Sequence, residues 1–147
     1  MPTQVDSLEA MYSVGFELGE KLQRGDILLL NGTLGAGKTS LVQGIAKAFG
    51  ITGVTSPTFV ISRIYSGAIP LIHVDAYRLV GEPWALFDDL DLESQSQDSI
   101  TIIEWGDGFV ERIADEYLEI KLEFGEADDQ RILTFIPHGQ RWSGFTS

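Results

Sequence analysis

An α/β fold is predicted by three features, which indicate a single domain with a mixed, mainly parallel sheet, antiparallel hairpins and helices on both faces. A short apolar run over residues 27–30 precedes a glycine-rich loop, which leads into apolar residues at helical spacing over 40–49. A second apolar run, over 100–104, is typical of another buried parallel strand. Alternating apolar and charged residues over 117–124 predict a half-exposed strand.

The glycine-rich loop, residues 32–39, reads G-T-L-G-A-G-K-T and matches the phosphate-binding pattern G-x-x-x-x-G-K-[ST]. Its glycines let the backbone approach an anion closely, with backbone N–H groups facing it at a helix N-terminus. We expect Lys38 to neutralise the β- and γ-phosphates and Thr39 to offer its hydroxyl to Mg²⁺. Because the motif lies between a predicted strand and a predicted helix, it indicates a P-loop NTPase-like domain rather than a turn capping an ordinary helix. The predicted nucleotide-binding residues of this stretch are Gly32, Thr33, Leu34, Gly35, Ala36, Gly37, Lys38, Thr39 and Ser40.

Composition narrows the class of protein further. The chain has 147 residues, a net charge of −12 and no cysteine. The lack of cysteine excludes disulfides, thiolate metal sites and cysteine nucleophiles. So acidic a chain is not expected to bind nucleic acid directly, because such binding needs a basic surface. No apolar run is long enough to span a membrane and the first residues do not resemble a signal peptide, so we expect a cytoplasmic protein without membrane contact.

The N-terminal part predicts a helix from about Asp6 to Gln23. Asp6 can accept a hydrogen bond at the helix start, and Glu9 can reach back toward it as in a capping box. Gly25 is placed to end the helix in the left-handed conformation. Beyond the second helix, residues 53–58 are expected to form a loop because of their Gly, Ser and Pro content.

Two strand-like segments, residues 59–65 and 69–75, flank a short Ser-Gly-Ala turn and predict a β-hairpin. The second segment ends at Asp75, a position where a carboxylate that orients water or faces a metal is often found. His73 could be a ligand or a general base, although a hydrogen-bonded structural role is more common for a lone histidine at a strand end. Arg78 fits a structural salt bridge better than a phosphate contact.

A further helix is expected to start near Pro83, and the acidic run over 88–93 fits a solvated helix end better than a metal cluster. The apolar run over 100–104 ends in Glu104, a second position for a metal-binding carboxylate. Thr39 with either Asp75 or Glu104 could hold Mg²⁺, and these residues alone do not rank the two carboxylates.

The C-terminal part predicts a short helix over 109–113 and then a strand pair, 117–124 with 131–137, joined by an acidic turn. From His138 onward the chain is rich in Gly, Ser and polar residues, and we expect this tail to be frayed. No repeat or linker divides the chain, so residues 1–147 are predicted to form one domain.

Four motifs together resemble the TsaE family, the small bacterial P-loop ATPase of threonylcarbamoyladenosine synthesis on transfer RNA. They are residues 32–39, Ser56-Pro57-Thr58-Phe59, His73-Val74-Asp75-Ala76-Tyr77-Arg78-Leu79 and Ile103-Glu104-Trp105, and their order and spacing match over about residues 5–136. The resemblance implies a protein that binds ATP and Mg²⁺ and joins a TsaD-type carbamoyltransferase and its TsaB-type partner. That assembly modifies adenosine 37 of transfer RNAs reading codons that begin with A. The ATPase activity would support repeated rounds of modification, with transfer RNA met only through the complex.

The resemblance also implies roles for individual residues. By this resemblance Lys38, Asp75 and Glu104 would form the catalytic set, with Asp75 as a water-orienting or second catalytic carboxylate and Glu104 joining Thr39 at Mg²⁺. Residues 56–58 would form a switch-like loop near the γ-phosphate. The resemblance also implies that Trp105 helps to shape the site and that Arg131, late in the chain, contacts the nucleotide. Thr33 departs from the pattern, because the family commonly has Asp there.

Two other functions remain open at this point. A small-molecule P-loop kinase would share the loop, but such enzymes usually carry an Arg-rich lid, and the sequence has no Arg-rich segment. A module that senses ATP without hydrolysing it is the other, and the carboxylates Asp75 and Glu104 after apolar strands argue against it.

Overall fold

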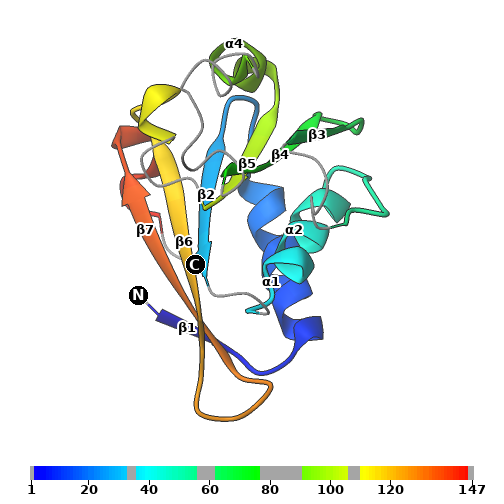
Figure 1. The fold of residues 1–147 in the computed structure, drawn as a ribbon, viewed down its shortest axis with the longest axis vertical. Helices are drawn as coiled ribbons and strands as arrows, with labels where there is room; N and C mark the ends of the chain where they lie inside the picture. The colour runs from blue at the N-terminus through cyan, green and yellow to red at the C-terminus, as the bar shows by residue number, and fades with distance from the viewer. Residues whose placement is uncertain (1, 33–35, 56–61, 77–90, 106–109, 146–147) are drawn as a thin grey trace.

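The computed structural model describes residues 2–32, 36–55, 62–76, 91–105 and 110–145. Seven strands form one sheet, in the order β1-β7-β6-β2-β5-β4-β3 (Figure 1). Their bounds are β1 Pro2–Val5, β2 Ile27–Gly32, β3 Ser62–Tyr65, β4 Leu71–Asp75, β5 Ile100–Glu104, β6 Tyr117–Phe124 and β7 Arg131–His138. The four central strands β6, β2, β5 and β4 are parallel, and β7, β1 and β3 join antiparallel at the edges. The predicted mixed α/β sheet with antiparallel hairpins is confirmed.

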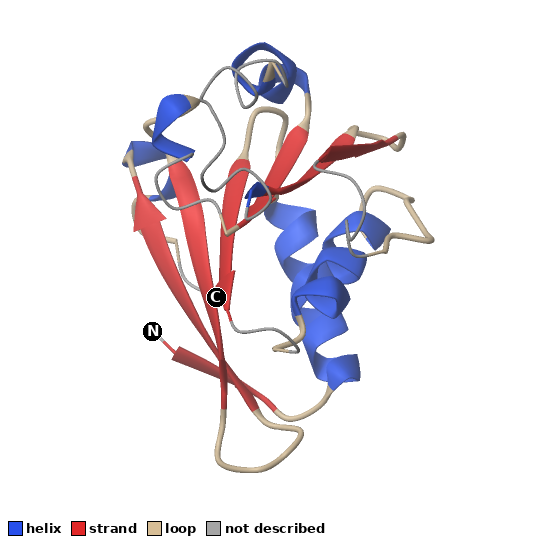
Figure 2. Ribbon diagram, viewed as in Figure 1, coloured by secondary structure: helices blue, strands red, loops and turns tan. Residues whose placement is uncertain are grey.

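Helical segments cover both faces of the sheet, but the long ones share one face. Helices α1 (Leu8–Lys21) and α2 (Lys38–Lys47) lie side by side against that face (Figure 2). The opposite face packs against α4 (Leu92–Gln95) and the 3₁₀ turn η3 (Val110–Arg112). Because side chains alternate along a strand, Leu28 and Leu30 of β2 join the core under α1 and α2, and Leu29 joins the other core. Among the described residues, no helix is both long and apolar enough to cross a bilayer.

Helices α1 and α2 approach closely enough to require glycine at their contact. A Cβ on Gly44 would lie 2.0 Å from the carbonyl oxygen of Tyr12, and one on Gly15 would lie 2.3 Å from that of Leu41. Such contacts are impossible for a real side chain, so the two glycines allow the backbones to touch. The packing holds α2 in place, and with it the helix N-terminus that follows the phosphate-binding loop.

The N-terminal prediction was wrong in its details. Strand β1 was not predicted, and it pairs antiparallel with β7 at the edge of the sheet. Ser7, not Asp6, caps α1, because its hydroxyl accepts the Ala10 N–H at 3.0 Å. The helix ends at Lys21, and Gly25 lies beyond it in a left-handed turn with φ of 91°.

Most other predicted elements are present. The hairpins β3–β4 and β6–β7 and the buried strand β5 are confirmed, and the short helix near residue 110 is the 3₁₀ turn η3. Residues 96–98 continue directly from α4 as the 3₁₀ turn η2 (Ser96–Asp98). The helix expected near Pro83 lies outside the described residues.

Residues 139–145 are packed, whereas the sequence predicted a frayed tail from His138 onward. A 3₁₀ turn, η4 (Gln140–Trp142), places the Trp142 side chain in the core, where it is 2% exposed. Arg141 donates from Nε and Nη2 to the two carboxylate oxygens of buried Asp26, at 3.0 and 2.9 Å. The burial of one tryptophan and a bidentate ion pair outweigh the Gly and Ser content that predicted fraying.

Candidate functional site

Three predicted site residues meet at the carboxyl edge of the parallel strands. Gly32 ends β2, Asp75 ends β4 and Glu104 ends β5. The strand register pairs Asp75 with Glu104, and Glu104 in turn with Leu30 of β2. Ligands bind at this edge in open α/β sheets, so the topology brings together residues that lie far apart in the sequence.

The described part of the phosphate-binding loop has the backbone that the motif requires. Gly37 precedes α2 with φ of 99°, a left-handed conformation that glycine adopts at no steric cost. A Cβ on Gly32 would lie 2.7 Å from the carbonyl oxygen of Leu122, so glycine is also needed at the end of β2. Ala36 is buried, and Thr39 and Ser40 are half-buried in the first turn of α2. Residues 33–35, the predicted Thr33, Leu34 and Gly35, lie outside the described residues.

Lys38 is a buried cation in an acidic setting. It is 7% exposed, and its Nζ donates to the Gly32 carbonyl at 2.8 Å. Burial lowers the pKa of Lys38 below its ordinary value, and the negative charges of Glu104 and Asp75 oppose that shift. Together these three side chains carry one more negative than positive charge, which favours a divalent cation near them.

Trp105 lies directly beside this lysine. Its ring centroid is 4.1 Å from Lys38 Nζ, a cation–π contact, and its backbone has φ of 60°, which is unusual for a residue other than glycine. A left-handed tryptophan immediately after a buried strand is a strained position of the kind found at functional sites.

Glu104 is buried, and its carboxylate bonds to His73. The Nε2 of His73 contacts Glu104 Oε2, while the other carboxylate oxygen, Oε1, lies 4.0 Å from Lys38 Nζ. His73 is fully buried in β4 two residues before Asp75, so the two side chains point to the same face of the sheet. The hydrogen bond predicted for His73 is present, and its partner is a predicted site carboxylate.

The donor set fits Mg²⁺ held together with a phosphate better than a permanently bound metal. Within the ranges that the structure describes, no three His, Asp or Glu side chains are grouped to hold a metal by themselves. Mg²⁺ in nucleotide sites is held by one or two protein oxygens, several waters and the phosphates. The carboxylates of Glu104 and Asp75 and the hydroxyl of Thr39 could supply those protein oxygens.

Arg131 lies near the same edge, at the start of β7. Its partner in the sheet is Phe124, two residues beyond the Leu122 that pairs with Gly32. The guanidinium covers the Phe124 ring at 4.4 Å and donates to the carbonyls of Asp128 and Gln130. A contact between Arg131 and a nucleotide stays a prediction. An open hollow of about 320 Å³ is lined by residues that include Gly32, Trp105 and Leu122.

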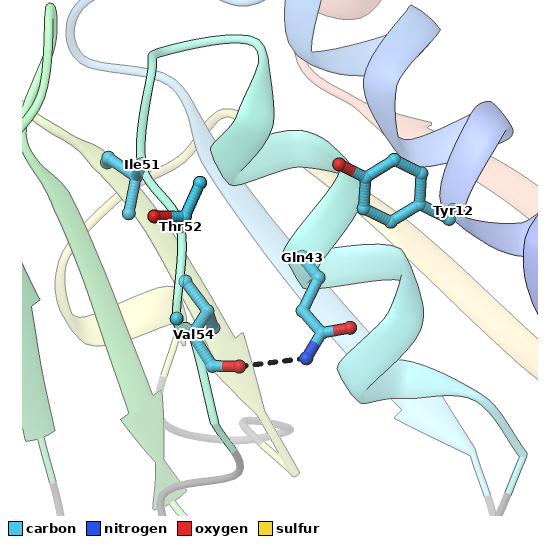
Figure 3. A pocket seen from close by; sticks show the side chains of 6 residues that line it. Tyr12, Gln43, Ile51, Thr52 and Val54 are labelled. Carbon is cyan, nitrogen blue, oxygen red and sulfur yellow. Dashed lines mark hydrogen bonds between the residues drawn. The ribbon is translucent and has the colours of Figure 1, made fainter.

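Helix α2 also holds the segment that leads to the predicted switch-like loop. Gln43 Nε2 donates to the Val54 carbonyl at 2.9 Å (Figure 3). A shallow pocket of about 130 Å³ lies beside this bond, lined by Tyr12, Gln43, Ile51, Thr52, Gly53 and Val54. Residues 56–58 themselves lie outside the described residues, as does Arg78.

The fold and the site together define a class of protein: a single α/β domain whose central strand leads through a phosphate-binding-loop sequence into a helix that begins with the motif's lysine. A family model described as "Threonylcarbamoyl adenosine biosynthesis protein TsaE" matches residues 5–133. The chain belongs to the TsaE family, as the four motifs predicted.

Relatives agree with this assignment over most of the chain. A protein of Streptomyces coelicolor named "tRNA threonylcarbamoyladenosine biosynthesis protein TsaE" is 41% identical over 140 residues, covering 90% of this chain and 94% of the relative. The protein of the same name from Bacillus subtilis is 39% identical over 121 residues, covering 80% and 73%. The crystal structure of Bacillus subtilis YdiB has a TM-score of 0.79 and 30% identity, covering 97% of this chain and 88% of that one.

Proposed function

We propose that this chain is the ATP-binding and ATP-hydrolysing subunit of a cytoplasmic assembly that forms threonylcarbamoyladenosine at position 37 of transfer RNAs reading codons that begin with A. It acts with a TsaD-type carbamoyltransferase and a TsaB-type partner, and it meets transfer RNA only through them. Membership of the TsaE family supports the pathway, because the relatives are named for threonylcarbamoyladenosine biosynthesis.

One observation carries the ATPase part of the proposal. Lys38, the lysine of the phosphate-binding motif, is buried at the start of α2, with Glu104 Oε1 4.0 Å from its Nζ and the charge of Asp75 acting on it. A buried ammonium beside two strand-end carboxylates supplies what phosphoryl transfer uses: a cation for the phosphates, oxygen ligands for a metal and an acid to orient water.

Each residue has a distinct role in this proposal. Lys38 and the backbone N–H groups at the start of α2 bind the β- and γ-phosphates, and Thr39 and Glu104 hold Mg²⁺ directly or through water. Bound Mg²⁺ supplies charge neutralisation on the phosphate oxygens. Asp75 orients the water that attacks the γ-phosphate, and Trp105 covers the Lys38 side of the site.

A sharp test follows the fate of the γ-phosphate. Purified protein with ATP and Mg²⁺ should release inorganic phosphate slowly without any acceptor. With the two partner proteins, the threonylcarbamoyl donor and unmodified transfer RNA, it should support many rounds of modification per complex. A Lys38→Ala protein should support one round at most. Phosphoryl transfer to a small molecule would identify a kinase instead, and ATP binding without turnover in the full assembly would identify a sensing module.

A further inference from the structure

We infer that His73 is a positioning residue for Glu104. Its Nε2–H holds one carboxylate oxygen, Oε2, so that the other, Oε1, is presented on the Lys38 side as the oxygen that ligates Mg²⁺. The inference rests on the proposed function, because it identifies His73 as the residue that orients Glu104, the metal-binding carboxylate of that site.

Burial makes this hydrogen bond important. Glu104 is buried, and a buried carboxylate must find hydrogen-bond donors to offset its lost hydration. Lys38 does not donate to it, since its Nζ is 4.0 Å from Oε1 and bonds to the Gly32 carbonyl. His73 is therefore the side-chain donor that the structure records at hydrogen-bonding distance from this carboxylate.

The opposite ring nitrogen indicates which tautomer is present. In the part of the chain that the structure describes, Nδ1 of His73 is buried without a hydrogen-bond partner. Because a carboxylate oxygen accepts, the bond to Glu104 requires a proton on Nε2. A ring with its proton on Nε2 alone donates to Glu104 and leaves a lone pair rather than an N–H buried at Nδ1.

The arrangement suits a site in which Lys38 has another partner. When a phosphate is bound, the Lys38 ammonium interacts with the phosphate oxygens as well as with Glu104. The hydrogen bond from His73 to Glu104 is unaffected by this change. His73 lies in β4, and its ring is fully buried, so it is a rigid support. Such supporting partners of metal ligands are commonly worth about 10–100-fold in metal affinity.

The chain contains a matched control for this pair. Its only other histidine, His138, also contacts a glutamate, Glu119, with 3.0 Å between Nε2 and Oε1. That histidine is 35% exposed and belongs to β7, at the end of the sheet opposite the site. A His138→Leu protein therefore reports the general cost of breaking a His–Glu pair.

The experiment compares ATP binding by calorimetry with Mg²⁺ and with EDTA. His73→Leu should lose about tenfold or more of the Mg²⁺-dependent gain in affinity, with metal-free ATP binding unchanged. His73→Gln, whose Nε2 can donate from nearly the same place, should keep most of the gain, and His138→Leu should keep all of it. Imidazole ¹⁵N spectra of the wild-type protein should show His73 protonated on Nε2 and not on Nδ1.

Each alternative outcome has one meaning. If wild-type protein shows no Mg²⁺-dependent ATP binding, the proposed function fails before the inference is tested. Unchanged Mg²⁺ dependence in His73→Leu overturns the inference, and so does an equal loss of ATP affinity with and without metal, which marks a purely structural histidine. If His73→Leu does not fold, the inference is judged on the other two results. It is overturned by a proton on Nδ1 alone, or by a folded His73→Gln protein that loses the Mg²⁺ effect.

Discussion

Lys38 lies 4.0 Å from Glu104 and yet donates its hydrogen bond to a backbone carbonyl, that of Gly32. The two side chains therefore form a long ion pair with no hydrogen bond between them. A phosphate can engage such a lysine without first breaking a hydrogen bond between Lys38 and Glu104.

Lys38→Ala is expected to weaken ATP binding by at least about tenfold and to abolish hydrolysis, because it removes a charge-assisted contact to the phosphates. Titration calorimetry measures the first effect and phosphate release the second. Lys47→Ala is the control, since that exposed lysine lies in the last turn of the same helix. Unchanged ATP affinity in Lys38→Ala would remove the phosphate site from this loop.

ATP affinity should fall with rising pH in the alkaline range. Burial lowers the pKa of Lys38 in the free protein, so this lysine loses its proton at a lower pH than an ordinary lysine. A bound phosphate favours the charged form and raises that pKa. Binding between the two pKa values therefore takes up a proton, and affinity decreases as pH rises. Calorimetry in two buffers of different ionisation enthalpy measures the uptake, which should be absent in Lys38→Met.

The two carboxylates are expected to differ in what they affect. Glu104→Ala should lower Mg²⁺-dependent ATP affinity as well as the rate of hydrolysis. Asp75→Ala should spare binding and remove turnover, because a residue that orients water acts only in the chemical step. Binding and single-turnover measurements on the same preparations separate the effects. The reverse pattern would exchange the two roles.

Partner proteins should accelerate a slow basal ATPase. In the described ranges, Lys38 is the cation that the structure records beside the strand-end carboxylates. In P-loop enzymes, an arginine supplied in trans by a partner raises the rate of hydrolysis by about 10³–10⁵-fold. A partner surface that closes residues 56–58 over the γ-phosphate would act in the same direction. Because this chain carries a net charge of −12, activation should weaken as salt screens its attraction to basic surfaces. A fast basal rate that partners leave unchanged would contradict the proposal.

Trp142→Ala should destabilise the fold by about 3–5 kcal/mol, the usual cost of truncating a buried large aromatic side chain. Denaturant unfolding gives the free energy, and ATP affinity measured well below the transition should be unchanged. Ile64→Ala, at an exposed position on β3, is the control and should have little effect. A loss below about 1 kcal/mol would mean that the tail is not part of the cooperative core.

The central strands β2, β4 and β5 could be predicted because each is a largely apolar run that ends in a glycine or an acid, as with Gly32 and Glu104, and β6 because apolar and charged residues alternate along it. Strand β1 could not, because four residues at a sheet edge, beginning with proline, carry too little periodicity to indicate a strand. The contact between His73 and Glu104 depends on the pairing of β4 with β5, which no local pattern encodes. The packing of Trp142 in the core also depends on tertiary contacts, and its polar neighbours in the sequence therefore led to the wrong prediction of a frayed tail.

The pairing of β1 with β7 separates the order of synthesis from the order of assembly. Pro2 and Val5 pair with Thr134 and Arg131, so β1 must wait until β7 has been made before it gains this partner. The ion pair between Arg141 and Asp26, which directly precedes β2, likewise forms only after residue 141 has been made. On the ribosome, the nascent chain could form the α1–α2 pair early, while this edge of the sheet closes only after residues 131–141 have emerged.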